Sequence, residues 1–148
     1  MPVPSEYNFA SMHFEKFMID ARDVSGLKTT HMAWNMVVGV LYTFRRRLSV
    51  NDAIRFANVL PPVVRAIFVS DWDLVQEILP FQDIKTMTDE VKSLRKEHNF
   101  SLDTAIQDTA TALRRNVDLI EFDKILLTLT KEAQEYWQVK ENHLENKD

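Results

Sequence analysis

The chain of 148 residues contains no cysteine. Disulfide bonds, thiolate metal ligands and a cysteine nucleophile are therefore excluded, because each of them needs a cysteine sulfur. The absence of disulfides weakly favours a reducing compartment. The sequence predicts a cytoplasmic location.

Glycine is almost as scarce, since only Gly26 and Gly39 occur in the whole sequence. β-Hairpins and phosphate-binding loops depend on glycine for backbone conformations with positive φ, so a sheet protein and a P-loop are both disfavoured. Hydrophobic residues make up 45% of the chain and charged residues 27%, a composition typical of a folded domain rather than of a disordered chain. At this length we expect a single domain over residues 1–148 with one core.

Long apolar runs are also missing. The most apolar stretch, residues 32–44, is interrupted by Asn35, Gly39 and Thr43 and is shorter than the about 20 residues that a membrane crossing needs. The first six residues have neither the basic nor the apolar segment of a secretory signal. We therefore expect no membrane partner and no export signal.

Apolar residues recur every three or four positions in the first half of the chain, which is typical of amphipathic helices. The first predicted helix begins at an N-cap, Ser11, and stops at Gly26, and its apolar side consists of Phe14, Phe17, Met18, Ala21 and Val24. A second helix, predicted over 30–47, is apolar on most sides and is expected at the centre of the fold. Ser49 predicts the N-terminus of a third helix, and Pro61-Pro62 that of a fourth.

The second half of the chain follows the same order of segments. Its first segment has the apolar spacing of the first predicted helix, Ser101 is predicted to cap the next helix, and Asp118 with Glu121 repeats the cap at Ser49. We therefore predict an all-α protein, a compact helical bundle of about eight helices formed by two diverged helical repeats. Repeat one is expected at about residues 11–72, repeat two at about 81–138, a hinge between Asp71 and Pro80, and a frayed C-terminal tail at 139–148.

Three segments carry a resemblance to a known family: Phe14-Glu15-Lys16-Phe17, Val40-Leu41 followed by Arg45-Arg46-Arg47-Leu48, and Leu60-Pro61-Pro62-Val63-Val64-Arg65. They are similar to the bacterial family known as domain of unknown function 2267. The resemblance covers residues of about 12–70 well and the remainder weakly, since Leu129-Thr130-Lys131 lacks the corresponding proline. It implies an all-helical, cytosolic bacterial protein and supplies no established activity.

The residue patterns of known catalytic and metal centres do not occur in the sequence. The four histidines, His13, His31, His98 and His143, have neither the i, i+4 spacing nor the HExxH frame of metal ligands. The serines lack the GxSxG frame of a nucleophile elbow. We predict no catalytic residue, no metal and no cofactor, and the sequence leans against an enzyme without excluding one.

Arginine is concentrated near predicted helix ends, at Arg45, Arg46, Arg47, Arg55, Arg65, Arg114 and Arg115. In a last helical turn these side chains offset the negative end of the helix dipole, which is the preferred interpretation. The alternative is contact with a phosphate or with a partner. Nucleic acid is disfavoured, because recognition of its backbone needs a wider basic surface and the chain has a net charge of −4.

Asp71, Trp72 and Asp73 lie at the predicted hinge and are the candidates for a cleft between the repeats. A turn or a helix N-terminus is the preferred interpretation, because side chains two positions apart on a helix do not face each other. The small or polar strip of Asn35, Gly39 and Thr43 predicts a close approach by another helix, from the second repeat in preference to a second subunit.

The preferred function is a non-enzymatic interaction or scaffold module with an unknown protein partner. One alternative is a small-ligand binder or enzyme with a site between the repeats, and another is anion or nucleic-acid binding through the helix-end arginines. Homodimerisation through an exposed apolar patch also stays open.

Overall fold

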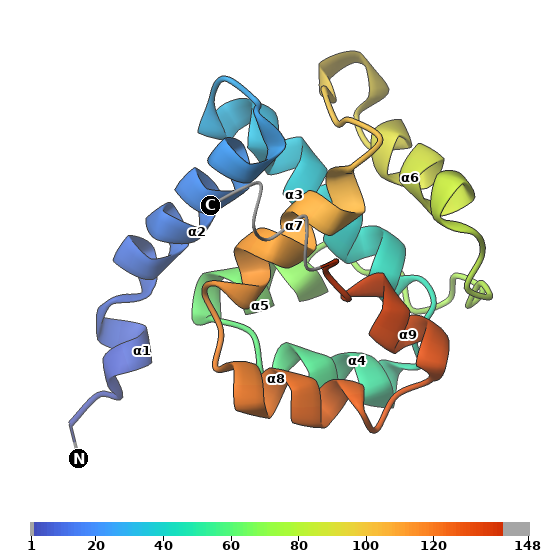
Figure 1. Cartoon of the computed structure of the whole chain (residues 1–148). Helices are drawn as coiled ribbons and strands as arrows, with labels where there is room; N and C mark the ends of the chain where they lie inside the picture. Colours follow the sequence, from blue (N-terminus) through green and yellow to red (C-terminus); the bar gives the residue numbers. More distant parts are fainter. Residues whose placement is uncertain (1, 141–148) are drawn as a thin grey trace.

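Helices form where the spacing of apolar residues predicts them. The computed structural model describes residues 2–140, and in that range the regular elements are all helical (Figure 1). They are α1 (Ser5–Asn8), α2 (Ala10–Ser25), α3 (Thr30–Arg45), α4 (Val50–Ala57), α5 (Pro62–Val69), α6 (Ile84–Ser93), the 3₁₀ helix η1 (Lys96–His98), α7 (Ala105–Arg114), α8 (Leu119–Leu126) and α9 (Lys131–Tyr136). The all-α prediction is confirmed, whereas the origin from two repeats stays a prediction.

Several helix termini are fixed by the residues that the sequence singled out. The Ser49 side chain accepts a hydrogen bond from the Asp52 amide at the start of α4, and Asp118 accepts from the Glu121 amide at the start of α8. Gly26 ends α2 in the left-handed conformation, with φ of 77°. A cap of this kind contributes about 1 kcal/mol, because it satisfies an amide that has no partner within its helix.

Two predicted caps are wrong. Ser11 lies inside α2, whose N-cap is Phe9. Ser101 does not cap α7, because its hydroxyl donates to the Asn99 side chain instead. The turn before α7 is closed by backbone bonding of Ala105, so that the helix begins four residues beyond Ser101.

The core is centred on aromatic rings that belong to distant parts of the sequence. Phe44 of α3 lies 4.8 Å from Phe56, 5.0 Å from Tyr136 and 5.3 Å from Trp137, measured between ring centroids. All four side chains are buried. Aromatic pairs at such distances add about 0.5–1.5 kcal/mol to the burial of their area. The prediction that the second helix occupies the centre is confirmed, since α3 packs against α2, α5, α6 and α7.

The two halves of the chain pack against each other in a crossed manner, α2 against α7 and α3 against α6 (Figure 1). Gly39 makes the second contact possible, because a Cβ there would lie 2.8 Å from the carbonyl oxygen of Val91. Next to it, the Asn35 amide donates to the His98 carbonyl at 3.0 Å. The predicted close approach of a helix from the second half is confirmed.

Residues 70–83 connect α5 to α6 without helical structure, and we call them the linker. The predicted hinge lies within it. Of the predicted tail at 139–148, residues 141–148 lie outside the described residues. No helix in the described part of the chain combines the length and the apolar character that a bilayer crossing requires.

Candidate binding groove and the arginine triplet

Arg45, Arg46 and Arg47, which we call the arginine triplet, follow one another at the end of α3 and contact successive parts of the linker. Arg45 donates from Nη1 to the Ser70 carbonyl at 2.7 Å and to the last turn of α5 at 2.9 Å. Arg46 donates from Nε to the Glu77 carbonyl at 3.1 Å, and its own carbonyl accepts from the Leu79 amide. The triplet thus binds the linker near its start and its middle.

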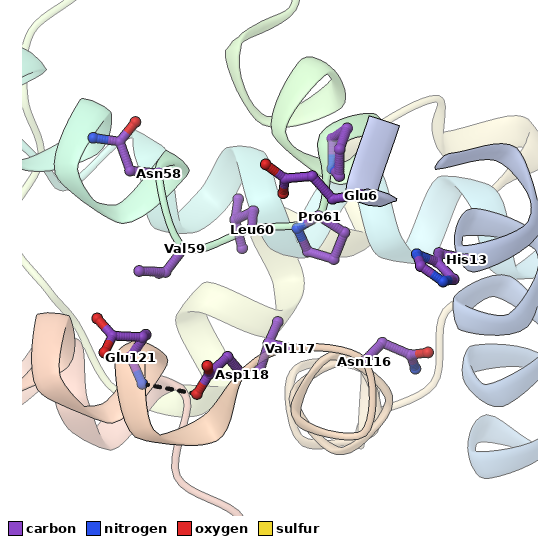
Figure 2. Close-up of a pocket in the computed structure, with 11 residues that line it drawn as sticks. Glu6, His13, Asn58, Val59, Leu60, Pro61, Asn116, Val117, Asp118 and Glu121 are labelled. Atoms are coloured by element: carbon purple, nitrogen blue, oxygen red, sulfur yellow. Dashed lines mark hydrogen bonds between the residues drawn. The ribbon is translucent and has the colours of Figure 1, made fainter. Parts of the chain in front are cut away.

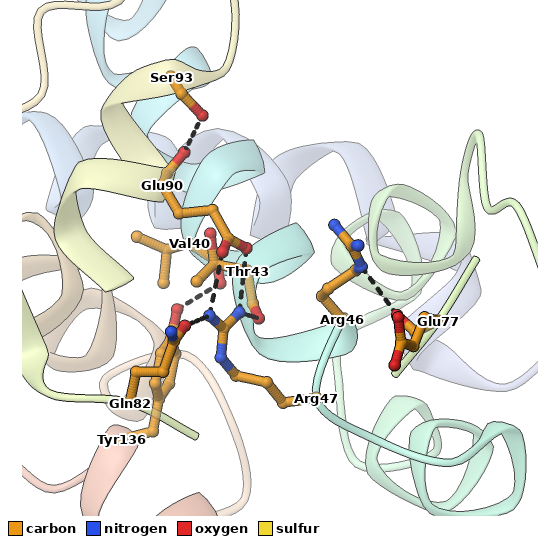
Figure 3. Close-up of polar contacts among 9 residues, drawn as sticks. All are labelled: Val40, Thr43, Arg46, Arg47, Glu77, Gln82, Glu90, Ser93 and Tyr136. Carbon is orange, nitrogen blue, oxygen red and sulfur yellow. Dashed lines mark hydrogen bonds and ion pairs between the residues drawn. The ribbon is translucent and has the colours of Figure 1, made fainter. Parts of the chain in front are cut away.

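Arg47 binds the end of the linker and is the most buried of the three, with a side chain that is 0% exposed. Its two terminal nitrogens each donate to one carboxylate oxygen of Glu90 at 3.0 Å (Figure 3). They also reach Gln82 Oε1 at 2.7 Å and the Thr43 carbonyl at 2.8 Å. That carbonyl belongs to the last turn of α3, where helical partners are missing. These contacts support the structural interpretation for Arg47.

The other arginines singled out by the sequence contact different parts of the fold. Arg65 donates to the Ala57 and Leu60 carbonyls and so closes the turn between α4 and α5. Arg114 donates to the Trp137 carbonyl at 2.8 Å and pairs with α8. Arg55 bonds to Asp52 and Thr128.

Arg115 acts on a carboxylate of α2. Burial tends to raise the pKa of Asp20, but hydrogen bonds from Lys16 and Asn116 outweigh it, and the charges of Lys16 and Arg115 add to them. The pKa of Asp20 is therefore lowered. The same hydrogen bonds connect α2 to the turn that follows α7.

Three adjoining pockets follow the outer side of α3, and we call them together the α3 groove. The first has a volume of about 550 Å³ and lies between α2 and the start of α3. The second, of about 410 Å³, lies between α3 and α5, and the third, of about 370 Å³, lies between the end of α3, the linker and α6. Trp34 borders the first two pockets, Tyr42 borders the last two, and Arg95 borders all three.

The two ends of the α3 groove differ in chemistry. At the first pocket, Trp34 is 38% exposed and stands edge-on to Phe14, with ring centroids 6.2 Å apart. At the third pocket, the Arg45 guanidinium lies 4.2 Å from the Tyr42 ring and 5.2 Å from the Trp72 ring. Burial lowers the pKa of Arg45, while Tyr42 and Asp71 act to raise it, and an arginine stays charged in any protein environment.

Asp71 and Arg95 have an unusual backbone conformation, and both line the second and third pockets. Their φ angles are 50° and 47°, and within residues 2–140 no other residue except glycine has a positive φ. The left-handed conformation costs a residue with a Cβ about 1–2 kcal/mol. Such strain is found preferentially at functional sites.

The predicted cleft residues are only partly brought together. Asp71 and Trp72 line the third pocket. Asp73 instead accepts a hydrogen bond from the Val75 amide at 3.0 Å in an exposed turn. No motif in the sequence indicates Arg95, because its position depends on the path of the chain after α6.

A further pocket of about 330 Å³ lies beside the turns after α4 and α7 (Figure 2). Several of its polar groups already have partners, since Asp118 caps α8 and Asn116 donates to Asp20 and to the Ala112 carbonyl. His13 and Glu121 also border it. Over the described residues, no group of three or more histidine and acidic side chains is placed to bind a metal ion.

Fold and groove together define an all-helical protein whose candidate site is a surface groove. The model of a family described as an uncharacterised conserved protein, DUF2267, matches residues 14–136. The chain therefore belongs to this family, and the match extends through the second half of the chain. A comparison with curated proteins gives no match.

Proposed function

We propose that this protein is a non-catalytic interaction module and that the α3 groove binds an extended segment of a partner protein. The observation that supports this function is that the three pockets share Trp34, Tyr42 and Arg95 in their linings. From Trp34 to Arg46 the helix rises by about 18 Å, which is the length of about five extended residues. A cytoplasmic location fits this proposal and stays a prediction.

The chemistry of the groove defines the partner segment. Phe14, Trp34 and Val38 offer apolar and aromatic surface in the first two pockets, and Arg45 and Arg46 line the third. A segment with large apolar side chains followed by an acidic group matches this order. Exposed aromatic side chains such as Trp34 often supply most of the energy in binding sites of this kind.

Selection from a phage-displayed library of random dodecapeptides on the immobilised full chain tests the proposal. We expect enriched peptides to share apolar residues, and the affinity of a synthetic copy to fall by about tenfold or more in Trp34→Ala. Ile84→Ala is the matched control, because Ile84 is an exposed apolar residue at the opposite end of α6 from Arg95. Absence of enrichment, or equal affinity for Trp34→Ala and the parent, would refute the proposal.

A second candidate function is self-association through α4 and α8. These helices contact each other and carry exposed apolar side chains, Ile54 at 52%, Ile120 at 77% and Leu127 just after α8 at 73%. Exposed apolar side chains on two helices in contact support a homodimer. Sedimentation velocity should give a dimer for the parent chain and a monomer for Ile120→Asp, and a monomeric parent would dismiss this candidate.

A further inference from the structure

The third pocket of the α3 groove has an excess of positive charge. Its lining includes three arginines, Arg45, Arg46 and Arg95, and two carboxylates, Asp71 and Glu90. Both oxygens of Glu90 are bound by Arg47, and the Asp71 charge acts on Arg45. Within residues 2–140, no ion pair joins a carboxylate to the other two guanidinium groups, those of Arg46 and Arg95.

These two guanidinium groups also retain hydrogen-bond donors. Arg46 uses Nε for the Glu77 carbonyl (Figure 3), and its terminal nitrogens have no hydrogen-bond partner within residues 2–140. The Arg95 side chain has neither a hydrogen bond nor an ion pair in the described part of the chain, although its backbone is held in the left-handed conformation. Guanidinium donors match the oxygens of carboxylates and phosphates in geometry and charge.

We propose that Arg46 and Arg95 form an oxyanion subsite in the third pocket of the α3 groove, the pocket that both side chains line, and bind a carboxylate or phosphate group of the ligand. Trp72 provides an apolar surface beside this group, because its ring borders the same pocket and is only partly buried. The inference rests on the proposed function in placing the ligand in the α3 groove. It adds that the ligand carries an oxyanion next to an aromatic or apolar part.

Titration of the ¹⁵N-labelled full chain by NMR tests the subsite. The probes are phenyl phosphate, benzoate, inorganic phosphate and, as the neutral control, phenol. We expect the Nε–H signals of Arg46 and Arg95 and the indole signal of Trp72 to shift with the first two probes and not with phenol. A lower Kd for phenyl phosphate than for benzoate identifies phosphate as the preferred group, the reverse order identifies a carboxylate, and either order supports the subsite.

Two variants separate the subsite from general charge attraction. Arg95→Gln should raise the Kd for phenyl phosphate by about tenfold, because it removes charged donors without breaking a hydrogen bond or ion pair within residues 2–140. The control Arg55→Gln removes an arginine of α4 that does not line the groove, and should leave the Kd within about twofold. Arg46→Gln should act as Arg95→Gln does, but it also breaks the bond to Glu77, so Arg95→Gln is the deciding variant.

Unchanged binding in Arg95→Gln, or equal affinity for phenol and phenyl phosphate, would overturn the oxyanion subsite. If only the proposed function fails, the library peptides do not bind, but phenyl phosphate still shifts the Nε–H signal of Arg95. Conversely, peptides that depend on Trp34 and ignore Arg95 would keep the interaction module and remove the subsite.

Discussion

Removal of Arg47 should destabilise the fold far more than removal of a surface charge. The variant Arg47→Met keeps most of the side-chain volume and loses two bonds to Glu90, one to Gln82 and one to Thr43. Breaking a buried ion pair by removing one partner costs about 3–5 kcal/mol. The Glu90 side chain is 30% exposed and regains water, so we expect a loss of about 2–4 kcal/mol.

Urea unfolding followed by circular dichroism measures this loss. Domains of this size have about 5–15 kcal/mol of stability, so the parent transition should shift clearly to lower urea. The control is Lys85→Met, which breaks an exposed pair with Asp89 whose side chains are 83% and 60% exposed. It should cost about 0.3–0.5 kcal/mol.

The double variant with Glu90→Gln isolates the pair itself. We expect a coupling energy above about 1 kcal/mol between the two sites, because they are in direct contact. If Arg47→Met costs no more than Lys85→Met, the contacts of Arg47 do not stabilise the linker and the structural interpretation of the triplet is refuted.

Gly39→Ala should destabilise the chain by about 1–2 kcal/mol in urea unfolding, because the new Cβ would lie 2.8 Å from the Val91 carbonyl oxygen. This clash outweighs the gain in helix propensity. An increase in stability would contradict the close packing of α3 on α6. Burial raises the pKa of Tyr136 well above 10.0, so the folded state keeps the phenol proton. The contribution of Tyr136 to stability is therefore complete below the unfolded pKa near 10 and is lost as the pH rises towards the folded pKa. Tyr136→Phe should therefore cost about 1 kcal/mol at neutral pH through the lost bond to Val40 and flatten the fall in stability above about pH 10, and an equally steep fall would disprove the assignment. Arg95→Gly relieves a left-handed conformation and should raise thermal stability by up to about 1 kcal/mol while weakening phenyl phosphate binding; a loss of stability would show that Arg95 has structural contacts.

Local signals in the sequence predicted the helices and several of their ends. Ser49, Asp118 and Gly26 act through neighbours within four residues, so their roles follow from spacing alone. The prediction that Ser101 caps a helix was wrong because its hydroxyl donates a hydrogen bond to Asn99 instead. The close approach of a helix at Gly39 could be predicted because a glycine in an otherwise apolar helix mainly serves to let another backbone come near.

The groove could be predicted only in part. Asp71 and Trp72 line the third pocket, as expected for a hinge between two halves, whereas Asp73 lies in an exposed turn because proximity in sequence does not determine where a side chain points. Their role in a cleft stays a prediction. Arg95 lines the same pocket as Tyr42 through the packing of α6 on α3, although the two residues are more than fifty positions apart in sequence. The residues around Arg95 in the sequence do not indicate that it lies next to α3.

The crossed packing of the two halves has a consequence for assembly. Because α2 packs on α7 and α3 on α6, each half supplies one side of both contacts, and neither half can complete them with its own helices. If the linker extends in two molecules at once, α6–α9 of each chain can occupy the same positions on the other chain, giving a domain-swapped dimer with the interhelical contacts preserved. By binding the linker back to α3, the arginine triplet favours the fold in which both halves belong to one chain, so weakening the triplet should increase exchange between chains.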